Sequence, residues 1–196
     1  MQLSCAIGLR AHSGWAAVVG VASAASAEPP EVVLRERIEL ADPAIPGAKA
    51  PYHSAEKLKL EDAAAFLARC EAASRALALS GLERILDRLR RDGRAPVRCG
   101  LLLAAGRPLP DLRSTLASHA WIHVGDGEHF RKALADAGSA CGLEMRSVRE
   151  RDVASSLGGP AGAVDAYLAR QRRLLGPPWA QDQKLAALAA WFALRN

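Results

Sequence analysis

The sequence predicts an α/β fold: a five-stranded mixed sheet, made of a three-strand antiparallel meander and two parallel strands, with helices on both faces. Three strand-like segments occupy the first 40 residues, and helical and strand-like segments then alternate along the chain. The apolar residues are mostly Ala, Leu and Val, and aromatic residues make up only 5% of the chain. This composition suits Ala-rich helices packed on an aliphatic sheet.

The three N-terminal segments predict the antiparallel meander. Residues 5–11 (CAIGLRA) and 15–23 (WAAVVGVAS) are continuous apolar runs, typical of strands buried on both faces. Residues 31–40 (EVVLRERIEL) alternate charged and apolar side chains, which is typical of an edge strand with one face in water. The connection between the first two segments is short and predicts a hairpin. Residues 23–30 are then the loop before the third strand.

The same N-terminal region also fits an export signal, with a short apolar stretch and the sequence Ala25-Ser26-Ala27 before Glu28. Three features favour the strand instead. The first residues are apolar rather than basic, residues 10–14 interrupt the apolar run, and a strand-like segment follows at once. We therefore expect a strand and a cytoplasmic protein, with cleavage before Glu28 as the alternative.

The rest of the chain predicts two parallel strands with crossover helices. Residues 41–60 are rich in Pro and Gly and predict a loop. An apolar stripe near helical period predicts a long helix over residues 60–91, ended by Gly93. Residues 96–106 (PVRCGLLLAAG) then predict a central strand, parallel because a crossover helix precedes it.

Short segments follow in which Pro, Asp and Gly mark the expected boundaries. Residues 121–124 (WIHV) predict an extended piece, and Asp126 is the expected N-cap of the next helix, which ends at Gly142. Pro110 and Asp111 are expected in the first turn of a short helix. Further elements are expected at residues 107–120 (short helix), 127–141 (helix), 143–153 (strand), 161–174 (helix) and 182–195 (helix).

The predicted order resembles that of the ribonuclease H-like superfamily over residues 5–152 and the final helix. Residues 6–19 (AIGLRAHSGWAAVV) look like the first strand and Gly-containing turn of its Holliday-junction-resolvase branch. Residues 182–194 (DQKLAALAAWFAL) resemble the last, Ala-rich helix of that branch, which begins with an acidic residue. The chain also resembles an uncharacterised bacterial family of about this length. The resemblance implies one ribonuclease H-like domain over residues 1–196, with C-terminal helical segments at 161–195.

The chain departs from the superfamily where its active nucleases hold two metal ions with carboxylates. The resemblance places one carboxylate on the first strand, where this chain has Leu9 and Arg10. Another belongs near the end of the fourth strand, where the chain has Ala104 and Ala105. Only Asp182 resembles a retained acid, so a divalent cation would lack hard oxygen ligands. We therefore expect no two-metal nuclease chemistry, no metal and no other cofactor.

A ligand site is expected where the first, fourth and fifth strands end, because ligands of open α/β sheets bind outside the carboxyl ends of the parallel strands. These ends are rich in Arg and in Gly-containing turns, which suits a phosphate. Ordinary ion pairs with nearby acids are the alternative interpretation. The candidate ligand-binding residues are Arg10, Ser13, Arg107, Arg149 and Lys184, and the candidate catalytic residues are His12, His119, Glu150 and Asp182.

The histidines at 119, 123 and 129 allow several interpretations. His119 and His123 would share a helical face if the following helix began early, and Glu128 or His12 would then complete a zinc site. The extended appearance of residues 121–124 argues against zinc. It favours histidines hydrogen-bonded between helix and sheet, or His12 or His119 as a general base.

Composition leaves three functional hypotheses open. The chain has 26 Lys and Arg against 21 Asp and Glu, and this net charge of +5 favours an anionic partner, either nucleic acid or a phosphate-bearing small molecule. The second hypothesis is a hydrolase or transferase that acts on a small anion with a histidine base. The third is a non-enzymatic scaffold that forms a homodimer through an edge strand or the last helix. No apolar stretch is long enough to span a membrane, so no membrane partner is expected.

Overall fold

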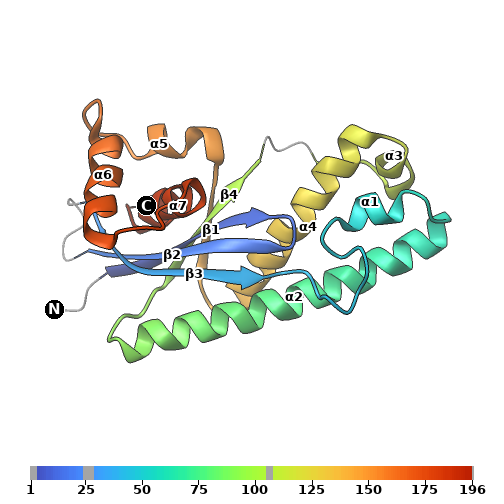
Figure 1. Cartoon of the computed structure of the whole chain (residues 1–196), viewed down its shortest axis with the longest axis horizontal. Helices are drawn as coiled ribbons and strands as arrows, with labels where there is room; N and C mark the ends of the chain where they lie inside the picture. The colour runs from blue at the N-terminus through green and yellow to red at the C-terminus, as the bar shows by residue number, and fades with distance from the viewer. Residues whose placement is uncertain (1–3, 24–28, 105–107, 196) are drawn as a thin grey trace.

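The predicted five-stranded mixed sheet is confirmed in the computed structural model, which describes residues 4–23, 29–104 and 108–195. The strands lie in the order β3-β2-β1-β4-β5, with β1 at the centre. The pairs β1–β2 and β2–β3 are antiparallel, whereas β1–β4 and β4–β5 are parallel, so β1, β4 and β5 end at one edge (Figure 1). The strands are β1 (Ser4–His12), β2 (Trp15–Ser23), β3 (Glu31–Glu39), β4 (Arg98–Leu103) and β5 (Glu144–Arg149).

Burial follows the sequence pattern of each strand. The apolar residues of β1 and β2 are buried on both faces, and the charged residues of β3 alternate with buried Val32, Leu34 and Ile38. Ser13 and Gly14 connect β1 to β2, and Gly14 has φ +80°, a conformation that favours glycine. The Gly14 carbonyl also accepts a hydrogen bond from Leu40 N at 2.8 Å, which fixes the end of β3 beside this turn.

One face of the sheet is covered by α2 (Leu60–Arg91) and α4 (His119–Ala140). The 32-residue α2 is about 48 Å long, whereas a nine-residue strand spans about 30 Å. The amino-terminal half of α2 therefore projects beyond the sheet (Figure 1). There it packs against α1 (Pro51–Ala55), α3 (Leu112–Leu116) and the first turns of α4. We call this assembly of α1, α3 and the first turns of α2 and α4 the helical extension.

The opposite face is covered by α7 (Gln181–Arg195), which lies directly on the strands. A Cβ atom at Gly8 would lie 1.9 Å from the Ala186 carbonyl oxygen, and one at Gly100 would lie 2.0 Å from that of Ala189. Only glycine allows the helix backbone to approach the sheet this closely. The same side carries η1 (Glu150–Asp152), α5 (Val153–Ser156) and α6 (Ala163–Leu175).

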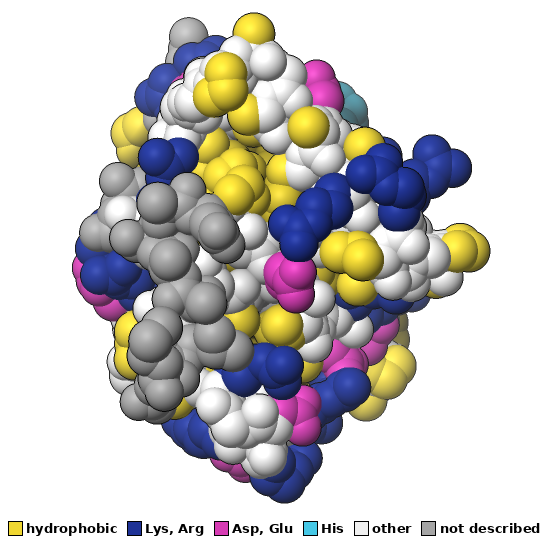
Figure 2. Space-filling view, turned by 90° about the vertical axis from the view of Figure 1, so that its left-hand side faces the viewer, with side chains coloured by type: hydrophobic (Ala, Val, Ile, Leu, Met, Phe, Trp, Pro, Cys, Tyr) yellow, Lys and Arg dark blue, Asp and Glu magenta, His cyan; other side chains and the backbone are white. Residues whose placement is uncertain are grey.

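Figure 2 shows the end of the molecule where α6 and the amino terminus lie. In the coloured part of this face, Lys and Arg side chains are spread around the rim and are separated by hydrophobic and acidic side chains. This visible surface does not present one continuous basic patch. No described helix combines the length and the apolar character that a membrane span requires.

Several local predictions are wrong, most of them around α1 and α4, and residues 150–152, which were predicted as strand, form η1. Residues 121–124 are helical rather than extended, because α4 already begins at His119. Asp126 is a buried residue inside α4 rather than its N-cap. Gly125 lies within the helix because the Tyr52 ring packs against it, where a Cβ atom would come within 2.7 Å of the ring. The predicted loop at 41–60 contains the short helix α1.

Candidate functional site

Arg10 forms a bidentate ion pair at the carboxyl edge of the sheet. Its Nε and Nη2 atoms donate hydrogen bonds to Glu150 Oε2 and Oε1 at 2.9 and 3.0 Å. Its Nη1 atom also donates to Asp182 Oδ1. The Arg10 side chain is only 18% exposed, and charge-assisted pairs of this kind are directional. One guanidinium therefore bridges two carboxylates from different elements.

His12 extends this arrangement toward β2 and β3. His12 Nε2 lies 2.8 Å from Asp182 Oδ1, and its ring stacks on Trp15 with ring centroids 4.3 Å apart. The Arg37 guanidinium carbon lies 4.2 Å from the centroid of the same indole. We call the group Arg10, His12, Glu150 and Asp182 the Arg10 network.

The backbone explains why these residues meet. Gly8, Arg10 and His12 are two residues apart along β1, so they share the face that α7 covers. The missing side chain at Gly8 lets α7 approach, and this brings Asp182, in the first turn of α7, to Arg10. Glu150 arrives from the other side, because it directly follows β5.

The predicted site residues divide into those in the Arg10 network and those outside it. Arg149 and Ser13 are exposed at the ends of β5 and β1, and Lys184 is half-buried on α7. Within the described parts of the chain, the side chains of Arg149 and Lys184 form no ion pair. Arg107 lies outside the described residues. His119 lies away from the network, in the helical extension.

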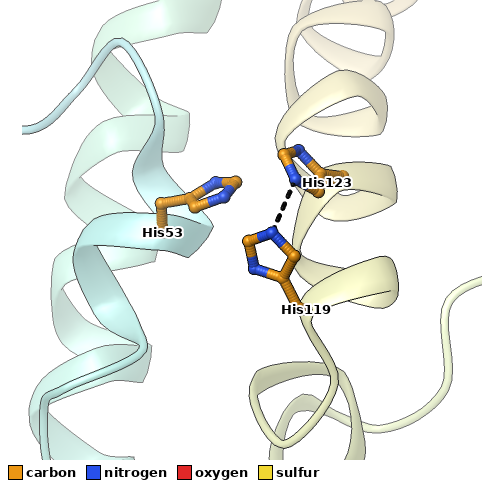
Figure 3. A group of neighbouring side chains, drawn as sticks. All are labelled: His53, His119 and His123. Carbon is orange, nitrogen blue, oxygen red and sulfur yellow. Dashed lines mark hydrogen bonds between the residues drawn. The ribbon is translucent and has the colours of Figure 1, made fainter.

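In the helical extension, His119 belongs to a cluster of three histidines. His53 comes from α1, and His119 and His123 come from successive turns of α4. One ring nitrogen from each histidine lies within 4.8 Å of those of the other two. The Nε2 atoms of His119 and His123 are 3.0 Å apart, and Figure 3 shows the three rings facing one another between the two helices. We call these residues the His53 cluster.

A buried carboxylate, that of Asp126, is hydrogen-bonded to one histidine of this cluster. The Asp126 side chain is only 10% exposed, and its Oδ2 atom is hydrogen-bonded to His53 Nδ1. Its Oδ1 atom accepts a hydrogen bond from the backbone N–H of Tyr52 at 2.7 Å. Asp126 therefore holds both the backbone of α1, at Tyr52, and the His53 ring against α4.

The remaining histidine of α4 and three of the cysteines, Cys5, Cys70 and Cys99, are buried in the core. His129 is buried and lies 3.0 Å from the Ser74 hydroxyl, and burial lowers the pKa of its imidazole. Burial raises the pKa of Cys5 to about 11 and also raises that of Cys99, so both thiols stay protonated. These groups support packing rather than chemistry at either cluster.

Comparison with known proteins identifies the fold. No protein-family model and no curated protein matches the chain. A solved structure of T. thermophilus RuvC in complex with a Holliday junction substrate matches with 12% identity and a TM-score of 0.53, covering 96% of this chain and 91% of that one. A second Thermus thermophilus RuvC structure matches with 14% identity and a TM-score of 0.51, covering 96% and 92%. This likeness shows a ribonuclease H-like fold, as the order of elements predicted.

Proposed function

We propose that the protein binds nucleic acid at the carboxyl edge of its sheet and does so without two-metal nuclease chemistry. The Arg10 network is the observation that carries this proposal, because it lies where ligands of open α/β sheets bind. One of the similar structures is a RuvC complex with a Holliday junction substrate, which supports nucleic acid as the class of ligand. The Arg-rich composition and the net charge of +5 favour the same class.

A pair of divalent cations does not fit the residues at this edge. The Arg10 guanidinium already lies between the carboxylates of Glu150 and Asp182 and neutralises them. A metal ion there would have to displace a side chain that is tied by three hydrogen bonds and would be repelled by its charge. At the end of β4, Ala104 offers no carboxylate. We therefore assign no metal-dependent step to this edge.

Exposed cations beside the network are the candidates for phosphate contacts. Arg149 projects from the end of β5 and Arg151 from η1, and both are exposed. Lys184 lies in α7, two residues after Asp182. Arg10 is committed to its two carboxylates, so we assign it a positioning role and give the phosphate contacts to its neighbours.

Binding is tested by fluorescence anisotropy with three probes: a four-way DNA junction, a duplex and a structured RNA. We expect binding that weakens steeply between about 50 and about 200 mM salt and that does not require Mg²⁺, so it should persist in EDTA. We also expect the bound strands to stay intact in Mg²⁺ and in Mn²⁺. Absence of binding at low salt would contradict the proposed ligand, and metal-dependent cleavage by the pure protein would contradict the proposed chemistry.

Two variants locate the interface. Arg149→Ala and Lys184→Ala should each weaken binding and should each reduce the slope of log affinity against log salt by about 1, because each removes one phosphate contact. Arg91→Ala is the matched control, since Arg91 is exposed at the carboxyl end of α2, which leads into the start of β4 and so lies at the edge of the sheet opposite the carboxyl ends of the parallel strands. An equal loss in the control would place the interface elsewhere.

One contact favours a second function, a hydrolase or transferase acting on a small phosphate ester. Asp182 Oδ1 lies 2.8 Å from His12 Nε2, an arrangement that orients the imidazole for proton transfer. A panel of phosphate esters should then show turnover that His12→Ala abolishes. Turnover that is indifferent to His12→Ala would remove this residue from the mechanism.

A further inference from the structure

We propose that His53, His119 and His123 form a binding site for a divalent transition-metal ion, with Zn²⁺ as the preferred metal. The site lies in the helical extension and is independent of the nucleic-acid function proposed for the sheet edge. It also departs from the expectation, drawn from sequence, that the protein holds no metal. For zinc, that expectation rested on the prediction that residues 121–124 are extended, whereas α4 begins at His119.

The ring nitrogens are placed as metal ligands require. His119 and His123 are four residues apart on α4, so their side chains leave the same helix face. Their Nε2 atoms are 3.0 Å apart, close to the roughly 3.3 Å that tetrahedral coordination at a zinc–nitrogen distance of about 2.0–2.1 Å implies. His53 faces this pair from α1, with a ring nitrogen within 4.8 Å of both (Figure 3). Edge-to-face packing of rings would not by itself require their nitrogen atoms to converge.

Asp126 provides the hydrogen bond that a metal-binding histidine makes through the ring nitrogen that does not bind the metal. Its buried carboxylate is hydrogen-bonded to His53 Nδ1, so the proton of this imidazole stays on Nδ1 and the lone pair of Nε2 is available to a metal. The second carboxylate oxygen accepts the Tyr52 N–H and holds the whole first turn of α1. Asp126 is thus a positioning residue for His53.

The donor set selects the class of metal. Three imidazoles suit Zn²⁺, Co²⁺, Ni²⁺ or Cu²⁺, whereas Mg²⁺ and Ca²⁺ prefer oxygen ligands. His119 and His123 are exposed, so a fourth coordination position would face solvent and would take a water molecule. Three protein ligands and one open position are typical of reactive zinc sites rather than of closed structural ones.

The metal would add a cross-link between α1 and α4, which the Asp126 hydrogen bonds already join. The helix α1 has only five residues, and its N-cap residue, Ala50, makes no side-chain capping hydrogen bond. A metal bound by His53 and by the first two turns of α4 would cross-link this short helix to the core helix. We therefore expect metal binding to raise the thermal stability of the folded chain.

The test uses the full chain without an affinity tag, stripped with a chelator and titrated with ZnCl₂ by calorimetry. We expect one equivalent of Zn²⁺ to bind per chain and to raise the melting temperature, with no response to Mg²⁺. Titration with Co²⁺ should give the visible absorption of a four- or five-coordinate nitrogen site. Absence of stoichiometric Zn²⁺ binding by folded protein would overturn the proposal.

Variants identify the ligands. Because His119 and His123 are exposed, the double variant His119→Ala/His123→Ala should fold normally, as circular dichroism would check, and should lose Zn²⁺ binding. Asp126→Asn should keep the stoichiometry but weaken the affinity about 10- to 100-fold, as is usual for outer-shell partners. His12→Ala is the matched control, since it removes a histidine from the Arg10 network, and it should leave Zn²⁺ binding unchanged. Undiminished binding in the double variant would assign the metal to other residues and refute the site.

Discussion

The Arg10 network and the His53 cluster each join a histidine to a carboxylate, but different groups meet at their centres. Each gathers side chains from elements far apart in the sequence, and in each a histidine is hydrogen-bonded to a carboxylate, that of Asp182 within the network and that of Asp126 beside the cluster. In the Arg10 network, a guanidinium from the chain itself lies between the carboxylates. In the His53 cluster, one ring nitrogen from each of three imidazoles converges with those of the other two.

The difference shows that a chain can either pair its polar side chains with one another or leave them available to bind an ion. A guanidinium completes the Arg10 network with directional hydrogen bonds, so this network depends on packing and has no need of an ion. In the His53 cluster, the Nε2 atoms of His119 and His123 can hydrogen-bond to one another, and a metal ion would instead take the lone pairs of both. The two groups should therefore respond differently to substitutions and to added metals.

We expect the largest effect from a substitution that displaces α7, because it should disrupt the Arg10 network and leave the His53 cluster in place. Gly8→Ala places a Cβ atom 1.9 Å from the Ala186 carbonyl oxygen, so α7 must move off the sheet and carry Asp182 away from Arg10. We expect the free energy of unfolding to fall by about 3 kcal/mol or more, measured by urea denaturation. The His53 cluster does not involve α7, so Zn²⁺ binding by the folded fraction should persist.

Gly127→Ala is the matched control for this prediction. A Cβ atom at Gly127 would meet only the end of the flexible Arg131 side chain, and Ala has a higher helix propensity than Gly. This variant should be as stable as the parent chain or more stable by up to about 1 kcal/mol. Equal losses in the two variants would mean that the close approach of α7 is not what makes Gly8 necessary.

Arg10→Ala tests whether the guanidinium holds its network together. The substitution leaves the carboxylates of Glu150 and Asp182 without their shared cation in a partly buried place. We expect a loss of about 2 kcal/mol in the free energy of unfolding, between the values typical of exposed and of buried ion pairs. Arg90→Ala, which removes an exposed pair with Asp87 on α2, should change stability by less than about 0.5 kcal/mol. A loss of similar size in the two variants would make the network an ordinary surface ion pair.

Arg10→Asp reverses the charge at the centre of the network. Three carboxylates would then share the place of one guanidinium and would repel one another, so this variant should be less stable than the parent chain. Mn²⁺ should raise its melting temperature more than that of the parent, because oxygen ligands now outnumber cations there. The double variant His119→Ala/His123→Ala serves as the background, so that binding at the His53 cluster does not contribute. If Mn²⁺ raised the melting temperature of the parent and of Arg10→Asp equally, the result would contradict the conclusion that the Arg10 guanidinium occupies the position of a cation between the two carboxylates.

Most of the fold and part of the Arg10 network could be predicted from sequence, because the elements and the ends of the strands follow from local sequence patterns. The apolar runs of β1 and β2 and the stripe of α2 specify strands and a helix without tertiary information. The rule that parallel strands end at one edge placed Arg10 and Glu150 together, and the resemblance supplied Asp182. Ion pairs between the Arg residues at this edge and nearby acids were the alternative interpretation. The sequence did not decide in its favour, since the pairing of Arg10 with both acids depends on how closely α7 approaches at Gly8.

The His53 cluster could not be predicted in the same way, because its geometry depends on a long-range contact. Glycine is a poor helix former, so Gly125 and Gly127 predicted a helix start where α4 in fact continues. Gly125 is required there by the Tyr52 ring of α1, a contact between distant segments. His119, His123 and Asp126 share a helix face, and that spacing was a usable signal. No local pattern indicated that His53 would join them.

The smallest expected effect concerns His129, the one histidine that α4 buries. Burial lowers the pKa of its imidazole below the ordinary value of 6.5, so the unfolded chain binds a proton at a higher pH than the folded chain does. The free energy of unfolding should therefore fall as the pH drops through 6.5 and should stop falling below the pKa of the folded state. His129→Gln removes this titration, so its stability should decline less than that of the parent between about pH 7.5 and about pH 5. The comparison uses chelator-treated protein, so that the His53 cluster carries no metal, and it records the pH dependence rather than the stability at one pH. A parallel decline in the two proteins would show that His129 does not contribute to the acid sensitivity.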